Sequence, residues 1–166
     1  MNHAKKLTIA GVLVAVGVAL SPFSIPVGIA RAFPVQHMIN VIGGVLLGPV
    51  YAAIMAFTTA SIRNMLGTGT LLAFPGSMIG ALMAGLAAKY VRGNLLPACA
   101  AELVGTGLLG ALIAYPVAAF ILGREVALFA FVIPFTASSI TGAAIAFVLL
   151  TVLMRTGIFE KYINAT

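Results

Sequence analysis

Apolar residues dominate the chain and form long runs that are interrupted by glycine, proline and charged residues. A helix that crosses a bilayer needs about 20 mainly apolar residues, and most of these runs approach that length. Glycine and proline at the interruptions are typical of helix ends. We therefore expect six transmembrane helices, near residues 6–21, 35–48, 50–66, 72–89, 96–122 and 128–154.

The connections between these runs differ in character. The first run ends at Ser21, and the connection 22–34 contains three prolines, so it cannot be helical throughout. Gly48-Pro49 predicts a tight hairpin between the second and third helices, because glycine can end one helix and proline can begin the next. The remaining connections are expected at 67–70, 92–94 and 123–125.

Composition places the chain among integral membrane proteins, because 62% hydrophobic and 7% charged residues leave too few polar groups to cover a soluble protein. The expected fold is an all-α transmembrane bundle formed by one domain, residues 1–166. Three acidic residues, two histidines and one cysteine disfavour a carboxylate-rich metal site, a thiol redox pair or a disulfide framework. The Gly-Thr-Gly segments at 67–69 and 105–107 are not followed by the Gly-Lys-Ser/Thr sequence of a nucleotide-binding loop. We expect no enzyme activity, metal or bound cofactor.

Six helices place both termini on one side of the membrane, and the basic residues indicate which side. With cytoplasmic termini, six lysines and arginines lie inside and three outside, in agreement with the positive-inside rule. The net charge of +6 therefore indicates membrane orientation, and the scattered cations do not predict nucleic-acid binding. A cleaved signal peptide is the alternative for the first run, but 30–32 is a poor cleavage site, which favours a retained helix.

Polar side chains gather at the outer ends of the predicted helices. Lipid provides no hydrogen-bond partners, so these groups favour a small pocket among the helix ends. Several also have a structural alternative: Arg63 can reach the headgroups, His37 can be solvated, and the serines of the last helix can bond carbonyls of that helix. The candidate substrate-binding residues are Gln36, His37, Asn40, Arg63, Asn64, Phe74, Ser77, Glu102, Tyr115, Ser138 and Ser139.

Glu102 is a carboxylate inside an apolar run, where it is costly unless it is paired, hydrated or protonated. The predicted topology places it nearer the cytoplasmic half than the other candidates. Two interpretations remain open, a ligand contact at the floor of the pocket and a structural bond to a neighbouring helix. A proton relay is disfavoured, because no second embedded acid accompanies it.

Small residues recur every four positions on the first helix, at Gly11, Ala15 and Ala19. This spacing produces a smooth face that another helix can approach closely. The face either packs within this protein or docks a separate membrane subunit.

The chain resembles the substrate-binding S-components of energy-coupling factor (ECF) vitamin transporters in its size, its six helices, its basic N-terminus and its Ala15/Ala19 spacing. Within that group it is similar to the ThiW family, the thiazole-precursor type. The strings that carry this similarity are QHMINVIGGVLLGP at 36–49, SIRN at 61–64, FPGS at 74–77, ELVGTG at 102–107 and YP at 115–116.

The resemblance implies that the protein captures hydroxyethylthiazole, the thiazole half of thiamine, from outside the cell. Its implied partners are membrane lipid, a transmembrane coupling subunit and two ATPase subunits, which hydrolyse ATP to drive uptake. Ala15 and Ala19 match the docking motif of the family. Arg31 and Arg63 make the predicted outer pocket cationic. Because thiamine is itself positively charged, this favours the neutral precursor over thiamine. The alternatives are an S-component for thiamine or another small vitamin, and an autonomous small-solute permease.

Overall fold

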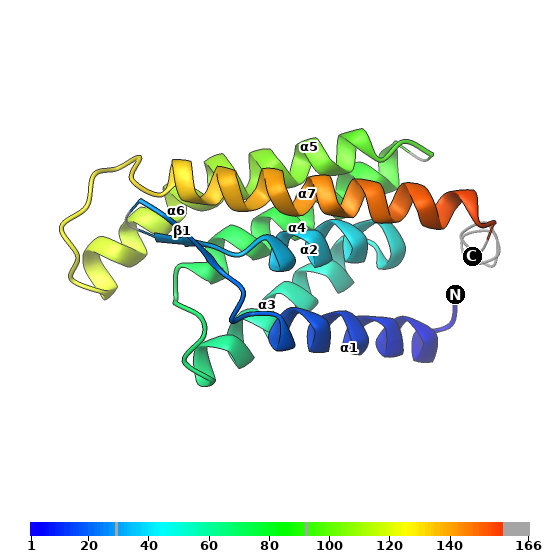
Figure 1. Cartoon of the computed structure of the whole chain (residues 1–166), viewed down its shortest axis with the longest axis horizontal. Coiled ribbons are helices and arrows are strands. Elements are labelled where there is room, and N and C mark those ends of the chain that lie inside the picture. Colours follow the sequence, from blue (N-terminus) through cyan, green and yellow to red (C-terminus); the bar gives the residue numbers. More distant parts are fainter. Residues whose placement is uncertain (29, 92, 158–166) are drawn as a thin grey trace.

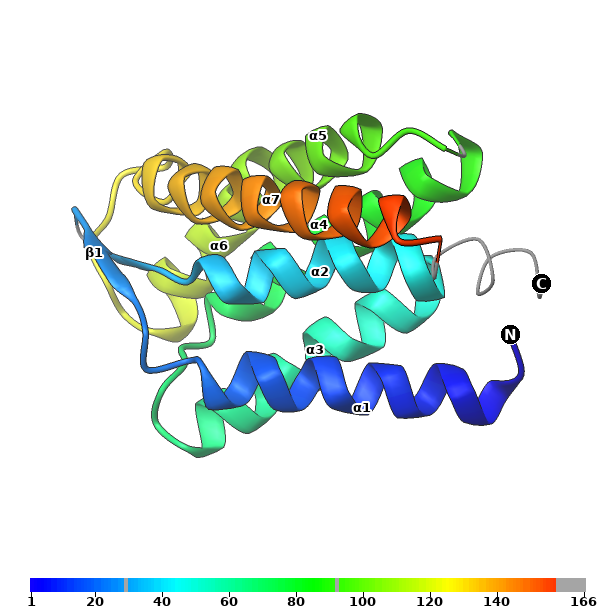
Figure 2. The same cartoon turned by 45° about the vertical axis from the view of Figure 1, so that its right-hand side comes forward.

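The computed structural model describes residues 1–28, 30–91 and 93–157, and in this part of the chain six helical segments run back and forth (Figures 1 and 2). The fifth segment, Leu96–Ile121, is one continuous rod that includes two π-helical stretches, η1 and η2. The elements are α1 (His3–Ala19), β1 (Ile25–Val27), β2 (Ala30–Ala32), α2 (Pro34–Leu47), α3 (Pro49–Met65), α4 (Ala73–Tyr90), α5 (Leu96–Val104), η1 (Gly105–Gly110), α6 (Ala111–Pro116), η2 (Val117–Ile121) and α7 (Val132–Arg155).

Local sequence explains most helix ends. The Asn2 side chain caps α1 by accepting a hydrogen bond from the Lys5 backbone N–H at 3.0 Å. Pro34 and Pro49 occupy the first turns of α2 and α3, where a missing N–H costs nothing. Gly48 joins these two helices with a φ of 88°, a conformation that favours glycine. The tight hairpin predicted at this position is confirmed.

Two features depart from the sequence prediction. The connection 22–34 contains a short antiparallel hairpin of β1 and β2, so the fold is not purely helical. Gly28, with a φ of 59°, lies in its turn. The last helix begins at Val132 instead of residue 128, because residues 127–131 form turns through bonds such as Ala130 N–H to Ala127 O at 3.0 Å.

The two ends of the bundle carry different elements. In Figures 1 and 2 the N-terminus and the C-terminal end of α7 lie at one end, together with the connection between α2 and α3. The β-hairpin and the connection between η2 and α7 lie at the opposite end, which we call the hairpin end. The helices therefore alternate in direction, as six successive passes require.

Small residues bring the central helices into close contact. A Cβ atom on Gly44 of α2 would lie 2.8 Å from the backbone N of Gly85 in α4. A Cβ atom on Gly105 of η1 would lie 2.9 Å from the Cα of Gly80 in α4. Because glycine has no side chain, these backbones approach one another closely. Polar groups on α2, α4 and η1 therefore come within hydrogen-bonding reach of one another.

Two segments, Leu96–Ile121 and Val132–Arg155, are long and apolar enough to cross a membrane, and Pro34–Leu47 is a shorter apolar helix. The helical fold and these segments fit a helical membrane protein. Passage of all six helices through the bilayer, with cytoplasmic termini, stays a prediction.

Candidate functional site

A cavity of about 200 Å³ lies at the hairpin end, between the β-hairpin and the first turns of α2, α4 and α7. Its apolar walls include Phe33, Leu72 and Phe135. Its volume lies below the roughly 300–1,000 Å³ that is usual for sites of drug-sized ligands, so it suits a smaller molecule. The polar residues that line it are Arg31, Gln36, His37, Thr70, Ser77, Arg124 and Ser138.

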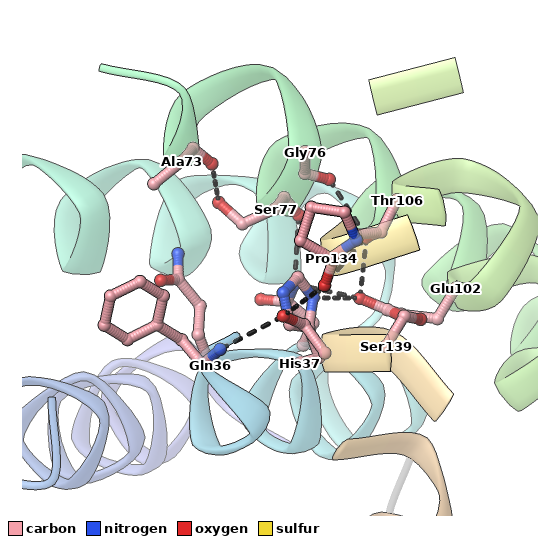
Figure 3. Close-up of polar contacts among 12 residues, drawn as sticks. Gln36, His37, Ala73, Gly76, Ser77, Glu102, Thr106, Pro134 and Ser139 are labelled. Atoms are coloured by element: carbon pink, nitrogen blue, oxygen red, sulfur yellow. Dashed lines mark hydrogen bonds and ion pairs between the residues drawn. The ribbon is translucent and has the colours of Figure 1, made fainter. Parts of the chain in front are cut away.

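Glu102 forms the centre of a buried polar network behind this cavity (Figure 3). His37 Nδ1 lies 2.7 Å from its Oε1 atom, and the Asn40 amide donates to the same oxygen at 3.3 Å. The Thr106 hydroxyl lies 2.9 Å from Oε1, and the Ser139 hydroxyl donates to Oε2. Four side chains from α2, η1 and α7 thus converge on one carboxylate, which removes the cost of its burial.

This arrangement favours one of the two interpretations of Glu102. The carboxylate is fully buried and bonded to His37, but it is absent from the cavity lining. Its position fits the interpretation of a structural bond between helices. His37, and not Glu102, presents this network to the cavity.

Arg63 lies at the C-terminal end of α3 and is 1% exposed, so the interpretation as a residue that reaches the headgroups is wrong. Its guanidinium carbon lies 4.0 Å from the centroid of the Phe33 ring, a cation–π contact. One guanidinium nitrogen donates to the Gln36 side-chain oxygen, and the other donates to the Thr68 carbonyl at 3.2 Å. Arg63 therefore holds two residues of the cavity wall in place.

The serines of α4 and α7 divide between two roles. Ser77 donates to the Ala73 carbonyl at 2.7 Å. Ser138 donates to the Pro134 carbonyl at 2.9 Å, as the alternative interpretation of the serines in the last helix predicted. Both nevertheless line the cavity, and Ser138 also accepts a hydrogen bond from the Phe33 backbone N–H at 3.1 Å. Ser139 instead donates to Glu102.

Besides Asn40, Arg63, Glu102 and Ser139, three further candidates lie outside the cavity lining. The Asn64 amide donates to the Ala60 carbonyl at 2.8 Å and to the Thr70 carbonyl at 3.1 Å, which connects the end of α3 to the segment before α4. Phe74 packs against Phe57, with ring centroids 5.6 Å apart. Tyr115 is half-buried in α6. Their side chains complete the fold near the site, and a direct role in binding stays a prediction.

Sequence reasoning missed Thr106 and Phe33. Thr106 follows Glu102 by four residues and therefore shares its helical face, which is a signal that the sequence contains. Phe33 precedes Pro34, and no local pattern connects it to Arg63. Arg124 was not among the candidate residues, and it also lines the cavity. Across the same described residues, no group of three potential metal ligands occurs.

The small residues of α1 are uncovered. Gly11, Ala15 and Ala19 are all exposed, and a Cβ atom on Gly11 would meet nothing within 4 Å. The opposite side of α1 packs inwards, with Ala10 and Gly17 buried. The interpretation that the small face packs within this protein is therefore wrong for the described part of the chain.

The model of the family described as "Thiamine-precursor transporter protein (ThiW)" matches residues 7–156. This match begins within α1, covers the other helices completely and agrees with the family resemblance found in the sequence. No curated protein and no solved structure gives a significant match.

Proposed function

Because the chain belongs to the ThiW family of thiamine-precursor transporter proteins, we propose that it is the substrate-binding S-component of an ECF-type importer. It captures hydroxyethylthiazole at the outer surface of the cell membrane, and separate subunits energise uptake. In this arrangement the hairpin end faces outwards, both termini are cytoplasmic and all six helical segments cross the bilayer.

The observation that carries the substrate assignment is the size and charge of the cavity. About 200 Å³ is small for a two-ring vitamin but sufficient for a single substituted heterocycle. Arg31 and Arg124 line this cavity, and no acidic residue does so among the described residues. A cationic thiazolium, as in thiamine, would meet uncompensated positive charge. The neutral thiazole avoids this penalty, and Phe33 and Phe135 can pack against its ring.

The exposed small residues of α1 support the proposal that a second subunit binds this helix. Gly11, Ala15 and Ala19 leave a smooth strip on which another membrane helix can approach closely. We assign this strip to the ECF transmembrane coupling subunit, with two ATPase subunits behind it. ATP is hydrolysed by those partners, and this chain acts as neither an enzyme nor a cofactor carrier.

Two other functions use the same cavity. An S-component for thiamine or another small vitamin would differ only in ligand preference. An autonomous permease would carry the same solute without ATPase partners. The exposed strip on α1 favours the multi-subunit importer over the autonomous permease, because a self-sufficient permease needs no such face.

Ligand binding to the purified full chain in detergent tests the substrate assignment. Hydroxyethylthiazole should raise the melting temperature in a saturable way, and at a hundredfold excess over the dissociation constant the added stability is about 2.7 kcal/mol. The pyrimidine half of thiamine and intact thiamine are the comparison ligands. Tight binding of thiamine without binding of the thiazole would contradict the proposal.

Transport separates the importer from the permease. Proteoliposomes that contain this chain alone should not accumulate the thiazole, whereas addition of the coupling subunit and ATPases with ATP should produce uptake. Uptake by the chain alone would favour the permease.

A further inference from the structure

Two buried charged residues each orient one neutral side chain of the cavity wall. Arg63 donates to Gln36, and Glu102 bonds to His37. Gln36 and His37 are neighbours at the start of α2, and both line the cavity. Neither Arg63 nor Glu102 lines it. Arg63 and Glu102 therefore affect a ligand indirectly, through the Gln36 and His37 side chains that they orient.

Arg63 determines which end of the Gln36 amide remains for a ligand. A guanidinium can only donate hydrogen bonds, so the Gln36 atom facing it must be the carbonyl oxygen. This leaves the Gln36 Nε2 amino group, which is buried and has no hydrogen-bond partner among the described residues. An unpaired buried donor is unfavourable, and a ligand acceptor in the cavity would satisfy it.

Glu102 likewise determines which ring nitrogen of His37 donates a hydrogen bond and which one accepts. The Asn40 amide and the Ser139 hydroxyl donate to its two oxygens, Oε1 and Oε2, so both oxygens act as acceptors. The proton between Glu102 and His37 then belongs to His37 Nδ1, which donates at 2.7 Å. In a neutral imidazole this leaves Nε2 as an acceptor.

We propose that the cavity offers one donor and one acceptor of fixed polarity: Gln36 Nε2 donates to the ring nitrogen of the ligand, and His37 Nε2 accepts from its hydroxyl group. This inference rests on the proposed function and deepens it. It defines the substrate class as a small neutral heterocycle that carries both an acceptor nitrogen and a hydroxyl donor. An N-alkylated ring, which has no acceptor at that position, is rejected by Gln36 itself.

Ligand analogues test both contacts on the unaltered protein. The probes are hydroxyethylthiazole, its methyl ether, which lacks the donor, and the thiophene analogue, which lacks the ring nitrogen. Calorimetry on the purified full chain should show each analogue binding roughly tenfold to hundredfold more weakly than the thiazole. Equal affinity for the alcohol and its ether, or for the thiazole and the thiophene, would overturn the corresponding contact.

Two near-isosteric variants assign each contact to its residue. Gln36→Glu keeps an oxygen for Arg63 but replaces the donor with an acceptor, so the preference for thiazole over thiophene should disappear while the ether remains disfavoured. His37→Asn keeps an amide donor near Glu102 but removes Nε2, so the preference for alcohol over ether should disappear instead. The opposite pairing of variants and analogues would overturn the assignment.

An N-methylthiazolium probe provides the sharpest test of polarity. Relative to the unaltered protein, Gln36→Glu should improve binding of this cation against the neutral thiazole by at least roughly tenfold, because an acceptor now faces the ring. No change in that ratio would contradict donation by Gln36. Thr141→Ala, on the exposed side of α7, is the control and should leave every ratio unchanged.

Failure of this inference is distinct from failure of the proposed function. If the thiazole binds tightly but the analogues bind equally well, the S-component assignment stands and the fixed polarity falls. If the unaltered protein does not bind the thiazole at all, both fall together.

Discussion

Small residues recur at four-residue spacing on both α1 and α4, yet the two helices use them in opposite ways. On α4, a Cβ atom on Gly76 would lie 2.8 Å from the Phe135 ring of α7, and a Cβ atom on Gly80 would lie 2.8 Å from the Glu102 carboxylate oxygen Oε1 in the fifth helical segment. On α1, a Cβ atom on Gly11 would meet nothing within 4 Å. One smooth face makes room for an internal polar network, and the other remains available to a partner. The spacing of small residues predicts close approach, but only the structure tells what approaches.

The largest expected difference between the two faces is in transport. Replacing both Ala15 and Ala19 with Trp should reduce ATP-driven uptake to background, because bulky rings would prevent a partner helix from approaching α1. Binding of hydroxyethylthiazole by the isolated variant should stay within about twofold of the original, since no residue of α1 lines the cavity. Uptake assays in reconstituted vesicles and calorimetry measure the two activities.

Ala144→Trp is the matched control, because Ala144 is an exposed small residue on α7. It should leave both uptake and binding intact. Normal uptake by the double α1 variant would eliminate the docking face, and parallel loss of binding and uptake would show that α1 supports the fold instead.

A smaller difference between the two faces is expected in stability. The same glycine-to-alanine substitution should change the free energy of unfolding in opposite directions on α4 and on α1. Gly80→Ala should lower the free energy of unfolding by about 1–3 kcal/mol, because the new methyl group overlaps the Glu102 network. Gly11→Ala should raise the same free energy by about 0.5–1 kcal/mol, because alanine loses less backbone freedom than glycine in an open helical position. Reversible denaturation of the two variants in detergent measures both changes. Equal destabilisation would remove the distinction between the faces.

The last comparison concerns ligand affinity and two hydroxyl groups on α7. Ser138 and Thr141 each donate to a carbonyl four residues earlier, at 2.9 Å and 2.8 Å, but only Ser138 lines the cavity and accepts from the Phe33 backbone. Ser138→Ala should weaken ligand binding by about 0.5–1.5 kcal/mol, because the Phe33 wall loses its hydrogen bond. Thr141→Ala should leave affinity unchanged by calorimetry. Identical affinities for both variants would show that the Phe33 contact does not support the site.

Part of the site could be predicted from residue chemistry alone. Gln36, His37, Ser77 and Ser138 are polar residues near helix starts at one end of the bundle, and all four line the cavity. Their shared depth follows from the alternating direction of apolar segments. Their ligand contacts stay predictions, as does the orientation of the chain in the membrane.

Other features of the site could be recognised only in the tertiary structure. Glu102 looked too far from the outer cluster, but the close approach of Gly80 and Gly105 brings α4 to the fifth segment, and His37 reaches the carboxylate from α2. Arg63 had the sequence context of a residue that reaches the headgroups, and it is buried against Phe33 instead. Neither position follows from helical periodicity.

The sequence by itself determined the class of the protein, the six helical segments and the tight connection at Gly48-Pro49, because apolar run length and proline and glycine placement act locally along the chain. The tertiary structure alone decided which small face is covered, which arginine is buried and which polar groups meet. The bond between His37 and Glu102 joins positions 65 residues apart, and such a contact depends on how the helices rotate and approach one another. Local patterns constrain each helix but leave those rotations undetermined, and the packing of backbone against glycine selects among them.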